Sequence, residues 1–124
     1  MGMGERLQRH VDEVMKSVQE ITVQDLQARL AGGDKIEIVD VRDPDEWEKG
    51  HIPGAHLMSR GTLEFKVEKA FPDASACLVL HCGGGTRSAL AAYSLQAMGY
   101  DNVLSLRGGF RDWQANDGEI TQEL

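Results

Sequence analysis

The residues best suited to chemistry lie in one stretch, where a cysteine separates an apolar run from three glycines. The run 78–80 predicts a buried strand, Cys82 follows it, and Arg87 and Ser88 open a helical pattern rich in alanine and leucine. A strand, a glycine loop and the start of a helix commonly hold an anion on backbone N–H groups. Because Cys82 stands at the mouth of this loop, the anion could be the protein's own sulfur.

The loop after Cys82 favours the charged form of its sulfur. Cysteine reacts as the thiolate, and a helix start and a guanidinium both stabilise negative charge. Glycines let successive N–H groups turn toward one centre, and they leave room for a small anion. We therefore predict that Cys82 is the catalytic residue. The predicted substrate-binding residues of the loop are Gly83, Gly84, Gly85, Thr86, Arg87 and Ser88.

The spacing of the loop narrows the reaction. Four residues separate Cys82 from Arg87, whereas cysteine-dependent phosphatases as a family place five residues between the two. A shorter ring suits a sulfur atom carried on the cysteine better than a tetrahedral phosphate in front of it. A small cysteine-dependent phosphatase or arsenate reductase is therefore an alternative that the loop length disfavours.

Short apolar strands alternate with helices along the chain, which predicts an α/β fold with a mostly parallel sheet. Ligands of such sheets bind at the carboxyl ends of the strands. Arg42, Cys82 and Arg107 each follow a predicted strand, so we expect them at one edge of the sheet. The predicted strands are 20–22, 36–41, 56–58, 76–81 and 103–106, and the predicted helices are 5–19, 23–31, 44–49, 62–70, 87–98 and 110–115.

Polar residues next to the predicted strands are expected to support the loops. Asp40 and Arg42 are two positions apart and so lie on the same side of their strand. A salt bridge and hydrogen bonds from this pair would hold neighbouring turns. His51 is expected to bond backbone groups. His81 should point to the face opposite Cys82, which makes it a poor base for the thiol.

Composition and charge exclude several classes of protein. A chain of 124 residues suits one domain, and its net charge of −7 argues against non-specific nucleic-acid binding. No apolar run is long enough to span a membrane, and the first twenty residues lack the apolar core of a secretory signal. Cys77 and Cys82 are too far apart along a strand for a disulfide. Cys77 is interpreted as a core residue, and the chain as a reduced, cytoplasmic protein.

The chain divides into three predicted parts. Residues 1–19 form an amphipathic helical extension, because apolar residues recur there every three or four positions. This helix either packs on its own domain or contacts a partner, for example a second copy in a homodimer. Residues 20–116 form the domain, and the polar tail 117–124 is expected to fray.

Several separated motifs, in the same order, resemble those of the single-domain rhodanese-like (thiosulfate sulfurtransferase-like) family. The run Ile-Val-Asp-Val-Arg at 38–42, followed by Glu-Trp at 46–47 and Gly-His-Ile-Pro-Gly-Ala at 50–55, is similar to the family's N-terminal signature. The loop 82–88 is similar to its active-site loop in the six-residue form. The stretch 99–113 is similar to its C-terminal pattern, so the resemblance covers about residues 20–115.

The resemblance implies a three-layer fold with a central parallel five-stranded sheet and helices on both faces. It implies that Cys82 takes a sulfane sulfur from a thiosulfate-like anion, forms a persulfide and passes the sulfur to a thiol, a partner protein or cyanide. Backbone N–H groups of residues 83–87 would hold the terminal sulfur, and no metal or organic cofactor would be needed.

Two further arginines are assigned from their surroundings in the sequence. The tripeptide Ser-Arg-Gly at 59–61 resembles a recurring variant of the family, and Arg60 carries charge at a plausible position after a strand. We therefore expect Arg60 to contact the donor, whereas Arg107 is interpreted as a structural or rim residue.

An alternative of another class is a non-enzymatic sulfur carrier or binding module that docks a partner through residues 1–19. The intact loop from Cys82 to Arg87 favours the enzyme.

Overall fold

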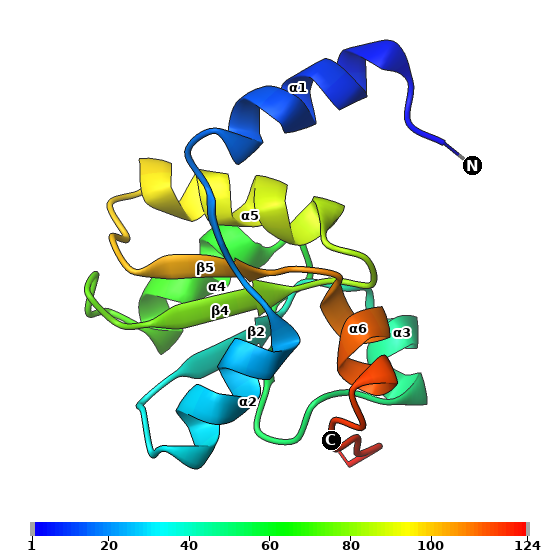
Figure 1. Cartoon of the computed structure of the whole chain (residues 1–124). Coiled ribbons are helices and arrows are strands. Elements are labelled where there is room, and N and C mark those ends of the chain that lie inside the picture. Colours follow the sequence, from blue (N-terminus) through cyan, green and yellow to red (C-terminus); the bar gives the residue numbers. More distant parts are fainter. Residues whose placement is uncertain (1, 124) are drawn as a thin grey trace.

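The computed structural model describes residues 2–123, and in this range the chain forms a five-stranded sheet (Figure 1). Its strands are β1 (Gln19–Ile21), β2 (Glu37–Asp40), β3 (His56–Leu57), β4 (Leu78–His81) and β5 (Val103–Leu106). The strand order is β1-β5-β4-β2-β3, and all pairs are parallel. The predicted α/β fold with five parallel strands is thereby confirmed.

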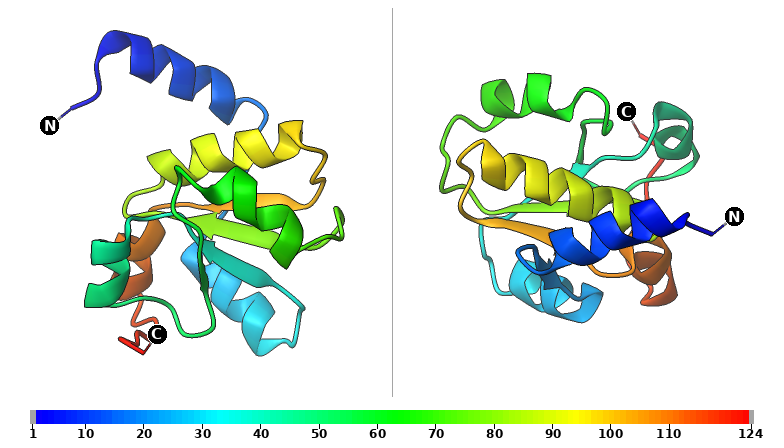
Figure 2. Two further views of the ribbon diagram at one scale, coloured as in Figure 1. Left: turned by 180° about the vertical axis from the view of Figure 1, so that it is seen from behind. Right: turned by 90° about the horizontal axis from the view of Figure 1, so that it is seen from above.

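Helices cover both faces of the sheet and so make a three-layer molecule (Figure 2). They are α1 (Glu5–Met15), α2 (Val23–Ala31), α3 (Pro44–Lys49), α4 (Leu63–Ala70), α5 (Thr86–Ala97) and α6 (Gly109–Ala115). Helices α1, α4 and α5 pack on one face, and α2 and α6 pack on the other.

The central strand β4 is buried on both faces, which explains its continuous apolar run. Leu78 and Leu80 pack into the core under α4 and α5, whereas Val79 packs into the core over α2 and α6. Successive strand residues point to opposite faces, so His81 lies on the α6 side and Cys82 on the α5 side. This confirms the prediction that the two side chains face apart.

Local capping signals set the helix boundaries as the sequence predicts. Thr22 precedes α2, and its Oγ1 accepts a hydrogen bond from the N–H of Asp25 at 3.1 Å. Asp43 and Glu46 form a capping box at the start of α3, and Pro44 occupies the first helical position.

The register of the sheet brings the predicted site residues to one edge. Leu80 of β4 pairs with Val39 of β2 on one side and with Ser105 of β5 on the other. The three strands therefore end at the same level, which we call the carboxyl edge. Arg42, Cys82 and Arg107 follow these strands and lie at this edge, as predicted.

Helix α1 packs on its own domain, through Val14 at its C-terminal end, with Val18 just beyond it. The helix ends at Met15, four residues before the predicted end, because Gln19–Ile21 pairs with β5 as an edge strand. Leu7, in the N-terminal half of α1, is 40% exposed. Within residues 2–123, no helix is long and apolar enough to cross a membrane.

The polar tail, which the sequence predicts to fray, is hydrogen-bonded to the domain in the residues that the structure describes. The N–H of Thr121 donates to the carbonyl of His51 at 2.8 Å, and the N–H of His51 donates back at 2.9 Å. Trp113 Nε1 donates to the carbonyl of Glu119 at 2.8 Å. Because the turn at His51 offers free backbone groups, the tail bonds there instead of to water. Met1 and Leu124, which end the predicted extension and tail, lie outside the described residues.

Candidate active site

The loop between β4 and α5 carries Cys82 at the carboxyl edge of the sheet. Gly85 adopts a left-handed conformation, with φ of 113°, and directly precedes Thr86, the first residue of α5. A glycine takes this conformation without strain, so the chain can turn sharply and begin α5 beneath the sulfur. Cys82 itself is only 1% exposed.

The sulfur of Cys82 sits on backbone N–H groups, as the sequence predicts for an anion site. The N–H of Gly85 donates to Sγ at 3.0 Å, and the N–H of Ser88 donates to it at 3.4 Å. The hydroxyl of Ser88 lies 3.6 Å from Sγ. The two N–H dipoles point their positive ends at the sulfur and so stabilise negative charge on it, whereas the Ser88 hydroxyl accepts from the thiol and donates to the carbonyl of Gly85.

Four further backbone N–H groups of the loop have no hydrogen-bond acceptor among the residues that the structure describes. Within residues 2–123, none of these N–H groups donates a hydrogen bond: Gly83, Gly84, Thr86 and Arg87. Those of Thr86 and Arg87 belong to the first turn of α5, where a helix cannot satisfy its own donors. These unsatisfied donors are available to an anion that enters the loop.

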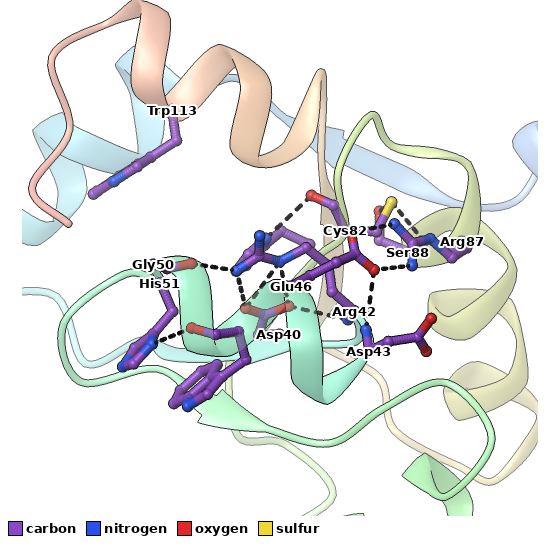
Figure 3. A network of polar contacts seen from close by, with 12 residues as sticks. Asp40, Arg42, Asp43, Glu46, Gly50, His51, Cys82, Arg87, Ser88 and Trp113 are labelled. Carbon is purple, nitrogen blue, oxygen red and sulfur yellow. Dashed lines mark hydrogen bonds and ion pairs between the residues drawn. The ribbon is translucent and has the colours of Figure 1, made fainter. Parts of the chain in front are cut away.

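The guanidinium of Arg87 forms a two-point ion pair with Glu46 of α3 (Figure 3). The two contacts measure 2.8 and 3.1 Å, and Glu46 also accepts from the N–H of Asp43 at 3.2 Å. Arg87 thus bridges α5 to the start of α3. Contact between Arg87 and substrate stays a prediction, because Glu46 occupies its guanidinium in this structure.

The ion pair changes the titration of both partners. The hydrogen bonds from Arg87 lower the pKa of Glu46 to about 2, against a burial effect that acts the other way. The hydrogen bond from Glu46 raises the pKa of Arg87. Both groups are therefore charged at neutral pH.

Asp40 and Arg42 form the predicted buried ion pair and tie the end of β2 to a turn. Arg42 Nη2 donates to Asp40 Oδ2 at 2.8 Å and to the carbonyl of Gly50 at 2.8 Å (Figure 3). The guanidinium also lies over the ring of Phe110, 4.1 Å from its centroid. The pair is 0 and 4% exposed; the predicted salt bridge is present, and its role in supporting the active-site loop stays a prediction.

His81 is a buried neighbour of this pair. Its Nδ1 lies 3.2 Å from the carbonyl oxygen of Cys82, and its Nε2 lies 3.5 Å from Asp40 Oδ2 without a hydrogen bond among the described residues. Burial lowers the pKa of His81, so the ring is neutral at physiological pH. It contacts the backbone of Cys82 and not the sulfur.

Arg60 and Arg107 each lie against a carboxylate. Arg60 Nη1 donates to Glu64 at 2.8 Å, and Glu64 also accepts from the hydroxyl of Ser94 at 2.7 Å. Arg107 is paired with Glu20 at 3.3 Å and is strongly exposed. No described contact joins Arg60 to the loop, so its contact with a donor stays a prediction.

Two parts of the site were missed by sequence reasoning. Ser105 of β5 is fully buried, and its hydroxyl lies 2.8 Å from that of Ser88. A serine in an otherwise apolar strand was the available signal. The start of α6 bonds the loop directly, since the N–H groups of Phe110 and Arg111 donate to the carbonyls of Cys82 and Gly83 at 2.8 and 3.1 Å.

The structure confirms the sequence-based interpretation of His51 but not that of Cys77. His51 Nδ1 lies 3.0 Å from the carbonyl of Trp47, and the two rings stack, which confirms that His51 serves backbone groups. Cys77 is a free thiol of intermediate exposure, 3.9 Å from Arg29 Nη2, and the interpretation as a core residue is wrong. It precedes β4 at the sheet edge opposite Cys82, where packing is less complete.

A cavity of about 480 Å³ lies elsewhere, between α2, β2 and the tail, and is lined by Leu30, Ile38, Trp113 and their neighbours. No residue of the loop lines it. The candidate site is the loop at Cys82, where backbone N–H groups contact the sulfur.

Comparison with known proteins agrees with this geometry. The sequence model of the Rhodanese-like domain matches residues 22–116. The thiosulfate sulfurtransferase GlpE of Pseudoalteromonas translucida is 35% identical over 87 residues, which cover 69% of this chain and 80% of GlpE. YrkF of Bacillus subtilis, named as a candidate sulfur carrier protein, is 29% identical over 84% of this chain and 55% of its own length. The chain thus spans about half of YrkF.

A solved structure resembles the whole chain, α1 included. It is a protein of unknown function from Rhodopseudomonas palustris CGA009, described as a possible tyrosine phosphatase. The two chains share 35% identity and a TM-score of 0.87, and 98% of each is covered.

Proposed function

Because the chain belongs to the rhodanese-like domain family, we propose that it is a sulfurtransferase in which Cys82 carries a sulfane sulfur from a thiosulfate-like donor to a thiophilic acceptor. The single observation that carries the proposal is the contact of Cys82 Sγ with the N–H groups of Gly85 and Ser88, at 3.0 and 3.4 Å, inside a loop with further unpaired donors.

In the first half-reaction the Cys82 thiolate attacks the outer sulfur of the donor. With thiosulfate, a new S–S bond forms to Cys82, the S–S bond within thiosulfate breaks, and sulfite leaves with the electron pair. The outer sulfur of the persulfide keeps a negative charge. The unpaired N–H groups of Gly84, Thr86 and Arg87 are suited to hold that charge.

In the second half-reaction the acceptor attacks the outer sulfur of the persulfide. The bond between the two sulfurs breaks, and Cys82 leaves as the thiolate, ready for another donor. A cellular thiol or a partner protein would be the natural acceptor, and cyanide would be the acceptor in an assay. Two half-reactions through a covalent enzyme give ping-pong kinetics.

The length of the loop and the ion pair of its arginine favour sulfur over phosphate as the group transferred. Four residues separate Cys82 from Arg87, and the Arg87 guanidinium is engaged in a two-point ion pair with Glu46. A phosphatase needs a guanidinium free to bind phosphate oxygens. The description of the Rhodopseudomonas palustris structure keeps phosphatase activity as an outcome to be tested.

A sulfur carrier would form the same persulfide without turning over small donors by itself. The likeness to YrkF makes this the second candidate. For either role we propose a reducing compartment such as the cytoplasm, which would keep Cys82 available as a free thiol.

The test compares wild-type protein with Cys82→Ser and Cys77→Ser. Cys77 is a matched control, since it is a free thiol near a guanidinium, and no backbone N–H of residues 2–123 donates to its sulfur. After thiosulfate treatment, intact mass should rise by one sulfur atom in wild type and in Cys77→Ser, but not in Cys82→Ser. Cyanide should then remove the sulfur as thiocyanate.

Three results separate the candidates. A persulfide without steady-state thiocyanate formation would indicate a carrier. A mass gain that follows Cys77 would contradict the proposed site. Hydrolysis of an aryl phosphate that Cys82→Ser abolishes, with no persulfide in wild type, would assign a phosphatase instead.

A further inference from the structure

The arginines near the carboxyl edge differ in whether a carboxylate already neutralises them. Arg42 is paired with Asp40, and Arg87 is paired with Glu46, both at 2.8 Å. Arg60 and Arg107 are paired too, as described above. An anionic donor would have to compete with a fixed carboxylate at each of these four residues.

Arg111 is the exception. It is exposed, and no carboxylate of residues 2–123 lies within ion-pair distance of its guanidinium. The protein carries a net charge of −7, so an anion needs a local positive site in order to approach. Arg111 can supply one without losing another ion pair.

The guanidinium of Arg111 lies against the loop that follows Cys82. A Cβ atom placed on Gly84 would stand 3.7 Å from both Nη1 and Nη2 and 3.9 Å from Cζ. The Nη end of the guanidinium therefore lies beside Gly84, about where the first atom of a side chain at this position would meet it. Because Gly84 has no side chain, nothing of its own separates the guanidinium from the loop.

The backbone of Arg111 is tied to the same loop. Its N–H donates to the carbonyl of Gly83 at 3.1 Å, and the N–H of Phe110 donates to the carbonyl of Cys82 at 2.8 Å. The side chain therefore starts from a point that is held relative to the sulfur. The guanidinium thus belongs to the surroundings of the loop that holds the sulfur.

We propose that Arg111 binds the anionic group of the sulfur donor and positions the outer sulfur for attack by Cys82; this rests on the proposed sulfurtransferase function. In thiosulfate the attacked sulfur carries an SO₃ group on its far side. That group leaves with the electron pair as sulfite. The guanidinium fork matches two of its oxygens, and the charge on those oxygens grows as the S–S bond breaks.

Ping-pong kinetics separate this role from a structural one. The value of kcat/KM for the donor reports the first half-reaction alone, and the value for cyanide reports the second. Arg111→Gln should lower kcat/KM for thiosulfate about tenfold and leave kcat/KM for cyanide unchanged. Arg111→Lys should recover part of the loss. Added salt should slow the donor step of wild type more than that of Arg111→Gln.

Arg107→Gln is the matched control, because Arg107 is an exposed arginine nearby that is paired with Glu20 away from the loop. It should leave both kinetic values unchanged. Equal loss of both values in Arg111→Gln, or the same donor loss in Arg107→Gln, would overturn the proposal.

Binding measurements distinguish failure of this proposal from failure of the proposed function. In the Cys82→Ser background, which cannot form a persulfide, thiosulfate binding is measured by calorimetry with and without Arg111→Gln. Weaker binding without Arg111 supports the anion site even if wild type proves inactive. Equal binding in the two proteins contradicts it even if wild type is an active sulfurtransferase.

Discussion

At the scale of single residues, the site depends on which carboxylate each arginine meets. Arg87 lies in the first turn of α5, next to the loop, and Glu46 holds its guanidinium at two points. The positive charge near the sulfur is therefore shared with a carboxylate. Stabilisation of sulfur-borne charge then falls mainly to the N–H groups of the loop.

The Glu46–Arg87 pair predicts a specific dependence of stability on pH. The folded-state pKa of Glu46, about 2, lies below its ordinary value of 4.5. A lowered acid pKa means that its stabilisation is complete above pH 4.5 and is lost as pH falls toward 2. Glu46→Gln should reduce the free energy of unfolding by about 1 kcal/mol at pH 7, because the pair is partly exposed.

Urea denaturation at a series of pH values checks this prediction. The difference between wild type and Glu46→Gln should shrink as pH falls from 4.5 toward 2. Glu13→Gln is the control. Glu13 forms an ion pair with Lys16 in which both side chains are more than 70% exposed, so the pair should contribute nothing measurable to the free energy of unfolding. A difference that stays constant over this pH range would contradict the assigned pKa.

At the scale of elements, the start of α6 and the loop after β4 are built against each other. Gly109 adopts φ of 56°, and a Cβ on it would stand 2.5 Å from the carbonyl oxygen of Cys82 and 2.9 Å from the backbone of Gly83. Glycine at this position lets α6 approach closely enough to donate two N–H groups to the loop.

Gly109→Ala should therefore act on both stability and activity. We expect a loss of about 3 kcal/mol in the free energy of unfolding, from left-handed strain and from overpacking against backbone. Persulfide formation should also slow, because α6 must move away from the loop. The measurements are urea denaturation and the rate of mass gain with thiosulfate.

Gly33→Ala is the matched control for this substitution. Gly33 also has a positive φ, 87°, but a Cβ there would meet no atom within 4 Å. It should cost only about 1 kcal/mol and leave persulfide formation unchanged. Equal losses of stability and equal rates of persulfide formation in the two variants would contradict the prediction. They would show that the close contact of α6 with the loop does not require glycine at position 109.

At the scale of the whole molecule, α1 lies outside the family match yet packs on the domain. The match begins at residue 22, whereas Val14 of α1 is 2% exposed in the core shared with α5. The apolar stripe of α1 is thus used within the chain at its C-terminal end, while Leu7 at the other end is 40% exposed. We propose that this exposed end is available to a second copy or a partner.

Two substitutions in α1 separate these uses. Val14→Ala should lower the free energy of unfolding by about 2 kcal/mol, because it opens a cavity in the core. Leu7→Ala should change it by less than about 0.5 kcal/mol. If α1 forms a dimer contact, sedimentation should show a dimer that Leu7→Ala dissociates. If the wild-type protein sediments as a monomer, α1 does not form a dimer contact and packs only on its own domain.

Sequence alone determined the local parts of this protein. The run 78–80, Cys82 and the glycines after it predict a strand, a turn and an anion cradle, because N–H direction and backbone freedom depend on a few neighbouring residues. The capping residues Thr22 and Asp43 predict where helices begin for the same reason. Alternation of short apolar strands with helices was sufficient for the parallel sheet.

Only the tertiary structure decided which distant groups meet. Glu46 lies 41 residues from Arg87, and Ser105 lies 17 residues from Ser88. These pairs exist because the strand order β1-β5-β4-β2-β3 brings three strand ends to one edge. Arg111 reaches the loop only because α6 packs on it. A charged residue could pair with many others in the sequence. Its actual partner depends on distance, because the energy between two charges falls with their separation, and packing sets that separation.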